Sequence, residues 1–154
     1  MKIAIASDHA AKDLKSYIFD FLTLTNHSVL DYGVAADAAG SVDYPDYADI
    51  VASEVCAGRA DRGILICGTG IGMCVSANKF PGVRAALVYD EFTTRMSRAH
   101  NDSNVLCLGA RTINHQRAVD FVKIWLATEF EEGRHRVRLN KIAAIEKRLK
   151  TAHD

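Results

Sequence analysis

The sequence has no long hydrophobic run and no net charge. Its 19 basic and 19 acidic side chains cancel at pH 7, so the chain lacks the global positive field that attracts nucleic acids or anionic membranes. No segment approaches the roughly 20 consecutive apolar residues that a membrane-spanning helix needs. The first residues, Met1 to Asp8, become acidic too early for a signal peptide. We therefore expect a cytoplasmic protein that binds neither nucleic acid nor membrane.

The sequence also lacks the cysteine patterns of metal sites and disulfide frameworks. Cys56, Cys67, Cys74 and Cys107 form no C-x-x-C pair and show no histidine spacing typical of zinc. A disulfide framework is not expected in a cytosolic chain of 154 residues. A chain of this length, with 49% hydrophobic residues, can bury a core of its own. We expect one domain that spans residues 1–154 and contains no metal.

Predicted strands and helices alternate along the chain. Short apolar runs predict five strands, and apolar residues at helical spacing predict helices between them. The expected strands are Lys2–Ser7, 29–32, 61–67, 83–88 and 104–108. The expected helices are 11–24, 45–57, 71–79, 90–99, 114–129 and 137–150. This alternation is typical of a doubly wound (Rossmann-like) α/β fold, in which helices cover both faces of a five-stranded parallel sheet.

The last predicted helix, 137–150, carries an apolar stripe. The stripe is formed by Val137, Ile142, Ile145 and Leu149, and little of the chain remains to cover it. We therefore expect this helix to pack on a second copy of the chain and to form a homodimer. The alternative is that the helix folds back onto its own domain.

A glycine-rich turn follows the third predicted strand. Its sequence is Cys67-Gly68-Thr69-Gly70-Ile71-Gly72, and a predicted helix follows directly. Unpaired N–H groups at a helix N-terminus can hold a phosphate, a carboxylate or a transient oxyanion. The turn is not a dinucleotide-binding G-x-G-x-x-G motif, because Met73 stands at the third glycine position, and it lacks the Lys-Ser/Thr ending of a Walker loop. An anion cradle and a purely structural turn remain the two interpretations.

Ligands of an open parallel sheet bind beyond the carboxyl ends of its strands. The residues expected at that edge are Asp8 and His9 after the first strand, Cys67 after the third, Tyr89 and Asp90 after the fourth, and Arg111 after the fifth. A thiol near a helix N-terminus can act as a base or a nucleophile. Cys67 is therefore a candidate catalytic residue, and the alternative is a cysteine that only packs at the end of a strand.

Two further polar clusters do not fall at that edge. His100 and Asn101 precede the fifth strand, so they are expected at the opposite edge of the sheet from the glycine-rich turn. They serve this site only if the geometry of the preceding helix brings them to it, or if they belong to the site of a neighbouring subunit. The alternative is that they simply cap the helix. Arg134 and Arg138 are four residues apart and would share a helix face. Together with Arg111 they would suit a phosphate, whereas alone they could form an exposed surface.

These residues identify the chain as similar to the ribose-5-phosphate isomerase type B family, which includes galactose-6-phosphate isomerase subunits. The matching stretches are 7–10, 43–45, 63–72, 77–79, 97–102, 109–111 and 133–135 with Arg138. The resemblance covers nearly the whole chain. The chain departs from the family pattern at two positions. Ala11 stands where a glycine often follows Asp-His-Ala, and Glu132 precedes Gly133 where a second glycine is common.

The resemblance implies a metal-free, cofactor-free aldose–ketose isomerase that interconverts ribose 5-phosphate and ribulose 5-phosphate through an enediolate. It implies that Cys67 is the base, that His100 opens the furanose ring, and that Thr69 and loop N–H groups stabilise the oxyanion. Some members use a glutamate base just after the loop, but residues 73–75 contain no carboxylate. The implied substrate-binding residues are Asp8, His9, Tyr44, Gly68, Gly70, Ile71, Gly72, Asn101, Arg111, Arg134 and Arg138.

Alternatives remain for the substrate and for the assembly. The same chemistry could act on allose 6-phosphate, galactose 6-phosphate or erythrulose 4-phosphate, because the sequence does not show the length of the pocket. A non-catalytic module that binds a phosphorylated ligand is a different class of function. We expect a homodimer whose sites are shared between subunits, with a tetramer as the larger alternative.

Overall fold

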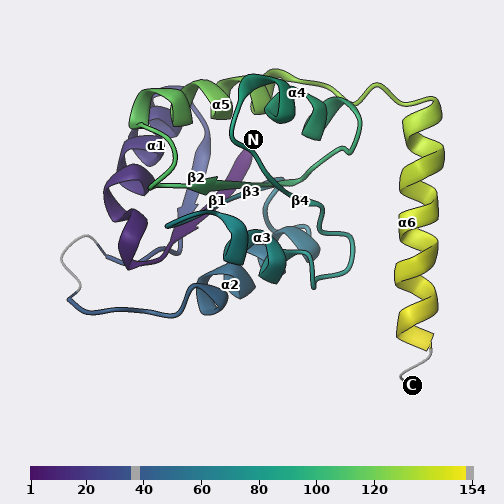
Figure 1. Cartoon of the computed structure of the whole chain (residues 1–154), viewed down its shortest axis with the longest axis horizontal. Helices are drawn as coiled ribbons and strands as arrows, with labels where there is room; N and C mark the ends of the chain where they lie inside the picture. The colour runs from purple at the N-terminus through teal and green to yellow at the C-terminus, as the bar shows by residue number, and fades with distance from the viewer. Residues whose placement is uncertain (36–38, 152–154) are drawn as a thin grey trace.

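A five-stranded parallel sheet forms the centre of the protein (Figure 1). The computed structural model of the chain describes residues 1–35 and 39–151. The strands are β1 (Lys2–Ser7), β2 (Ser28–Asp31), β3 (Arg62–Cys67), β4 (Ala85–Leu87) and β5 (Val105–Gly109), and their order in the sheet is β2-β1-β3-β5-β4. After β1 the chain adds β2 on one side of β1 and then crosses to add β3 on the other side. A topological switch point therefore lies between β1 and β3.

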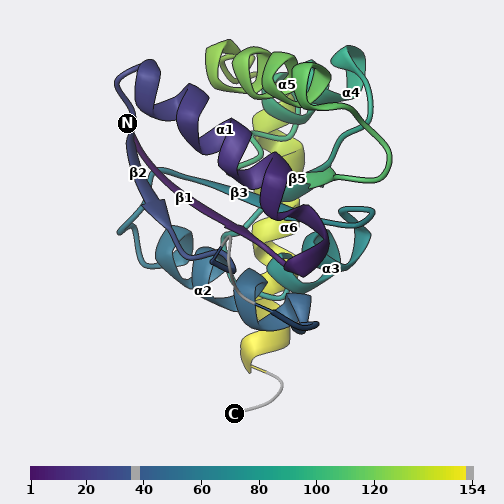
Figure 2. The ribbon, with the colours of Figure 1, turned by 90° about the vertical axis from the view of Figure 1, so that its left-hand side faces the viewer.

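Helices cover both faces of this sheet (Figures 1 and 2). One face carries α1 (Lys12–Leu24), α4 (Glu91–Ala99) and α5 (His115–Ala127), and a short 3-10 turn, η1 (His9–Ala11), precedes α1. The other face carries α2 (Tyr44–Cys56) and α3 (Ile71–Ala77). The predicted doubly wound α/β fold is confirmed.

The hydrophobic core is divided between the two faces by the alternation of side chains along each strand. In β1, Ile3 and Ile5 belong to the cluster with α1 and α5, whereas Ala4 and Ala6 belong to the cluster with α2 and α3. Successive side chains of a strand point to opposite faces. Both faces are buried, which explains why the strands read as continuous apolar runs in the sequence.

Several predicted boundaries shift because side chains bind the backbone. The edge strand β4 begins at Ala85 rather than at 83, because the N–H of Arg84 donates to Oδ1 of Asn104 at 2.7 Å. Helix α5 begins at His115 rather than at 114, because Asn114 is the N-cap and its Oδ1 accepts from the N–H of Arg117 at 2.9 Å. Such bonds cannot be read from hydrophobic periodicity.

The C-terminal helix α6 (Arg134–Thr151) stands beside the sandwich instead of covering the sheet (Figure 1). It begins at Arg134, earlier than the predicted 137, after Glu132 and Gly133 turn the chain with φ angles of 58° and 53°. The predicted stripe of Val137, Ile142, Ile145 and Leu149 is 49–55% exposed. The stripe is thus only partly covered by its own domain, where Ile142 lines a pocket with Val83 and the carboxylate of Glu146 accepts from the N–H of Gly82 at 3.0 Å. No helix within 1–35 and 39–151 has the length and apolar character to cross a membrane.

Lys15 and Asp31 form an ion pair between α1 and β2, and it predicts an asymmetric effect of mutation. Nζ of Lys15 lies 2.8 Å and 2.6 Å from the two carboxylate oxygens, and Lys15 is only 5% exposed. Asp31→Ala leaves this ammonium buried without its partner, so we expect a loss of about 3–5 kcal/mol in the free energy of unfolding. Lys15→Met removes the buried charge and keeps the aliphatic packing, so its loss should be much smaller. Urea denaturation measures both variants, and equal losses would contradict this account.

Candidate active site

A cleft of about 480 Å³ opens at the carboxyl ends of the central strands, at the topological switch point. Ser7, the last residue of β1, pairs with Ile66 of β3, and Cys67 pairs with Gly109 at the end of β5. This register brings together the loops that follow three strands. The predicted site residues that line the cleft are Asp8, His9, Tyr44, Cys67, Gly68, Thr69, Ile71, Gly72 and Arg111.

Cys67 lies at the foot of this cleft. It ends β3 and is 5% exposed, and the N–H of Gly70 donates to its Sγ at 3.1 Å. The sulfur is therefore rigidly held by the sheet and faces a backbone donor. A thiolate that must accept a proton from a carbon acid needs such fixed surroundings.

The glycine loop is shaped by close contacts. Gly70 adopts a φ of 79° and is buried, and because its N–H donates to Cys67 it forms the turn beneath the cleft surface rather than part of the lining. A Cβ on Gly72 would lie 2.6 Å from the ring of Tyr44, so glycine at this position lets Tyr44 form one wall of the cleft. The N–H of Ile71 donates to Oγ1 of Thr69 at 3.4 Å, which orients that hydroxyl.

Asp8, His9 and Arg111 supply the charged and polar rim. Oδ1 of Asp8 accepts from the N–H of Ala10 at 3.0 Å, and Nδ1 of His9 accepts from the N–H of Val42 at 3.1 Å. Because Nδ1 is an acceptor, a neutral His9 carries its proton on Nε2, which lies 3.4 Å from Oγ of Ser41. The guanidinium of Arg111 packs on Gly68, where a Cβ would lie 3.3 Å from its Cζ.

Asp90 and Tyr89, expected at the same edge, do not line the cleft. Oδ1 of Asp90 caps α4 by accepting from the N–H of Thr93 at 2.7 Å, and Tyr89 is 63% exposed. The physical reason is strand order, because β4 is the edge strand and lies beyond β5. Its carboxyl end is therefore remote from the switch point.

The remaining predicted residues, His100, Asn101, Arg134 and Arg138, also lie outside the cleft. Three of them, His100, Arg134 and Arg138, gather around His135, which is not among the predicted site residues. The rings of His100 and His135 stack with centroids 4.0 Å apart and planes 7° apart. Arg134 Nε and Arg138 Nη1 approach Nε2 and Nδ1 of His135, each at 3.4 Å. The helical spacing predicted for the two arginines thus brings both to one imidazole, and the position of His135 between them was the available signal.

His135 is held in its neutral form. Burial lowers the pKa of His135, and the nearby charges of His100, Arg134 and Arg138 lower it further, whereas Glu131 opposes them. The imidazole is 5% exposed. It can therefore accept a hydrogen bond from an arginine without cancelling the charge of that arginine.

The group formed by His100, Glu131 and His135 does not suit a metal ion. One candidate ligand atom of each lies within 4.8 Å of the others. However, the two imidazoles are stacked almost parallel, so their in-plane lone pairs point along parallel planes and do not converge on one centre, as tetrahedral coordination requires. Nε2 of His100 and His135 instead lie 3.6 Å and 3.8 Å from Oε2 of Glu131.

Glu132, which stands where the resembling family often has glycine, directs its charge away from this cluster. Its carboxylate accepts from Nε of Arg136 at 2.8 Å and from Nη2 at 2.5 Å. Glu132 lies just before α6, and Arg136 lies in the first turn of that helix, four residues further on. The carboxylate therefore does not occupy Arg134 or Arg138.

The fold and the cleft define an α/β protein with a cysteine at the foot of a cleft lined by a glycine-rich loop. The model of the Ribose/Galactose Isomerase family matches residues 3–142. Ribose-5-phosphate isomerase B of Escherichia coli (strain K12) is 42% identical over 147 residues, which cover 96% of this chain and 97% of that protein. The chain belongs to the ribose/galactose isomerase family.

Solved structures of family members agree with this assignment. Ribose-5-phosphate isomerase B of Clostridium thermocellum superposes with a TM-score of 0.93 at 48% identity and covers 97% of this chain and 99% of that chain. The Mycoplasma genitalium ribose-5-phosphate isomerase B with bound ribulose-5-phosphate superposes with a TM-score of 0.90 at 44% identity, over 95% of this chain and 96% of that chain.

Cys74 is a second thiol near the glycine loop, but it does not line the cleft. A hydrogen bond from the thiol of Cys107 lowers the pKa of Cys74 to about 6, with further help from the backbone of Leu87 and the side chain of Asn78, although burial opposes the shift. Burial in turn raises the pKa of Cys107. Cys74 is therefore the more acidic thiol of the pair, and its Sγ also lies 3.4 Å from the carbonyl oxygen of Ala85.

This asymmetry predicts the alkylation of Cys74. The thiolate is the reactive form, so the rate of its modification by iodoacetamide should rise as the pH increases through about 6 and then level off. Cys107→Ala removes the donor thiol and should move the profile to higher pH. The measurement is mass spectrometry of the peptide that contains Cys74, with Cys56→Ser as the background. A midpoint near the ordinary cysteine value of about 8.5 in the parent protein would contradict the prediction.

Proposed function

We propose that the protein interconverts ribose 5-phosphate and ribulose 5-phosphate through an enediolate. The observation that carries the proposal is the position of Cys67 at the foot of a cleft whose rim contains Arg111 and His9. A base buried beside donors and a cationic group is what proton transfer in a phosphorylated sugar requires. The M. genitalium relative, whose structure contains ribulose-5-phosphate, supports this substrate class.

In the proposed reaction, the thiolate of Cys67 removes the proton from C2 of the open-chain aldose. The electron pair of the C–H bond forms the C1–C2 double bond, and the carbonyl pair moves to O1. The same sulfur then returns a proton to C1 while the hydroxyl proton of O2 passes to O1, which leaves a ketone at C2. Thr69 and the N–H of Gly72 would donate to the oxyanion, because the N–H of Gly70 is already given to the sulfur.

The rest of the proposed site divides between recognition and ring opening. Arg111 would bind the phosphate with Arg134 and Arg138, and Asp8, His9 and Asn101 would bind hydroxyl or phosphate oxygens. Tyr44, Gly68 and Ile71 would border the sugar. His100 would move the proton of the anomeric hydroxyl to the ring oxygen, which opens the furanose before proton abstraction.

We infer that two copies of the chain build each site together. His100 and the arginines of α6 lie outside the cleft of their own chain, and the apolar stripe of α6 is about half exposed. A dimer in which α6 packs on the partner accounts for both observations, and a tetramer would be a pair of such dimers. The four free cysteines are in keeping with the cytoplasm as the place of the reaction.

Replacement of the base gives the first test. Cys67→Ala should abolish exchange of the C2 proton with solvent, followed by NMR of ribose 5-phosphate in D2O, while phosphate binding persists because Arg111 is unchanged. The matched control is Cys74→Ser, which alters a thiol outside the cleft and should leave exchange intact. Retained exchange in Cys67→Ala would identify another base, and a protein without any exchange activity in its parent form would be a binding module.

Mixing two inactive variants tests the shared site. Cys67→Ala and His100→Asn should each be strongly impaired on the cyclic substrate. After dissociation and reassociation of an equal mixture, half of the dimers combine one chain of each kind, and each mixed dimer contains one undamaged site if the sites are shared. Activity should then recover to about one quarter of the parent value by two-fold symmetry. No recovery would place His100 and Cys67 of one chain in the same site.

A second candidate is the same reaction on a six-carbon sugar phosphate, since the family description names galactose beside ribose. Values of kcat/KM for the phosphates of ribose, allose, galactose and erythrulose rank these substrates.

A further inference from the structure

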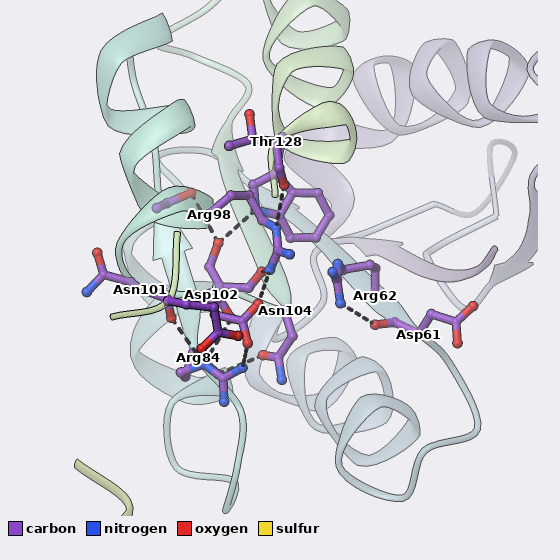
Figure 3. Close-up of polar contacts among 12 residues, drawn as sticks. Asp61, Arg62, Arg84, Arg98, Asn101, Asp102, Asn104 and Thr128 are labelled. Carbon is purple, nitrogen blue, oxygen red and sulfur yellow. Dashed lines mark hydrogen bonds and ion pairs between the residues drawn. The ribbon is translucent and has the colours of Figure 1, made fainter. Parts of the chain in front are cut away.

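A cluster of ion pairs lies beside Asn101, the residue that follows His100 in the chain (Figure 3). Its centre is Asp102. Oδ1 of Asp102 accepts from Nη1 of Arg98 at 2.7 Å, and Oδ2 accepts from Nη2 of Arg84 at 2.8 Å. The carboxylate therefore joins the last turn of α4 to the residue that precedes β4.

The same two guanidinium groups hold the backbone on both sides of Asp102. Nε of Arg84 donates to the carbonyl of Asn101 at 3.1 Å and to that of Asp102 at 2.9 Å. Nη1 of Arg98 also donates to the carbonyl of Ser103 at 2.7 Å. The carbonyl groups of three consecutive residues thus accept hydrogen bonds from arginine side chains. The path of the chain after His100 is set by these bonds.

Asp102 also binds the C-terminal end of α4, whose C-cap is His100. Its φ is 45°, in the left-handed region that L residues seldom adopt, and its N–H donates to the carbonyl of Arg98 at 3.0 Å. Beyond it, Oγ of Ser103 accepts from Nε1 of the fully buried Trp125 at 2.7 Å. The turn is therefore anchored to the core on its far side, and His100 is the residue at which the helix stops.

Fold stability alone does not account for this arrangement. Arg98 is 5% exposed, and burying an ion pair costs desolvation energy that its attraction often fails to repay, so apolar residues of similar size would give comparable stability. A buried, hydrogen-bonded pair instead fixes one geometry. The side chains presented by that geometry are His100 and Asn101, which belong to the candidate site.

We propose that Asp102 is a positioning residue: through Arg84 and Arg98 it holds His100 in the orientation needed for ring opening. This inference rests on the proposed function of His100. Asp102 itself does not touch the sugar, because both of its carboxylate oxygens are bound to arginines.

The test uses Asp102→Asn and a matched control. Asparagine tolerates a positive φ and has the size of aspartate, but it offers one acceptor oxygen and turns an NH2 group toward the other guanidinium. Asp102→Gly permits the same φ and removes both contacts. The control is Glu54→Gln, which removes the charge from another carboxylate–arginine pair, in which Oε1 of Glu54 lies 2.9 Å and 2.8 Å from Nε and Nη2 of Arg59. That pair joins the last turn of α2 to the residues that follow it and touches no candidate site residue.

A double-mutant cycle with His100→Asn separates positioning from stability. We expect Asp102→Asn to lower kcat/KM for ribose 5-phosphate about tenfold or more, and Asp102→Gly to lower it at least as much, at a temperature well below the Tm of each variant. In the His100→Asn background the same change should lower it less than about threefold, because the residue on which Asp102 acts is already absent. Glu54→Gln should leave kcat/KM unchanged in both backgrounds.

Equal fold losses in the two backgrounds, or a lowered Tm with unchanged kinetics, would overturn the positioning role of Asp102. These results are distinguishable from a failure of the proposed function. An inactive parent protein would overturn the proposed function together with this inference, whereas an active parent protein with independent losses would overturn the inference alone.

Discussion

The parallel pairing of β1, β3 and β5 is the constraint on which the cleft depends. Because Ser7 pairs with Ile66 and Cys67 pairs with Gly109, the chain leaves all three strands at one edge of the sheet. These strands are buried on both faces, so free backbone N–H groups and charged side chains can gather only beyond their ends. Cys67 is the last residue held by the sheet. Its sulfur is consequently rigid, while the residues after it are available to line the cleft.

The second half of the candidate site depends on two helix termini. Helix α4 stops at the turn of Asp102, and α6 starts after the turn of Glu132 and Gly133. The N–H of Glu131 donates to the carbonyl of Ala99 at 2.9 Å, which joins the two termini directly. The side chains of His100 and His135 stack at the same junction. The position of the arginines of α6 is thus set by the end of α4 and is independent of the cleft in the same chain.

Sequence reasoning reached the first half of the site more completely than the second. Hydrophobic periodicity predicts the strands, and parallel topology then places Asp8, Cys67 and Arg111 at one edge, as the structure shows. Periodicity does not reveal that β4 is the edge strand and lies beyond β5, so the prediction that Asp90 lies at the cleft is wrong. His135 was missed for a related reason, because its importance arises from a contact with His100 across two helices. Strand order and contacts between distant segments are not properties of a local pattern.

The arginines around the second half of the candidate site differ in whether a carboxylate pairs with them. Arg84 and Arg98 share an ion pair with the carboxylate of Asp102, and Arg136 forms an ion pair with Glu132. Arg134 and Arg138 contact the neutral His135 instead, and among residues 1–35 and 39–151 neither forms an ion pair with a carboxylate. A neutral imidazole can fix a guanidinium in place without cancelling its charge, whereas a carboxylate fixes the guanidinium and also cancels its charge. The structure therefore separates arginines that hold the backbone from arginines whose positive charge is left for an anion. This separation agrees with a phosphorylated substrate better than a count of basic residues does, because the net charge of the chain is zero.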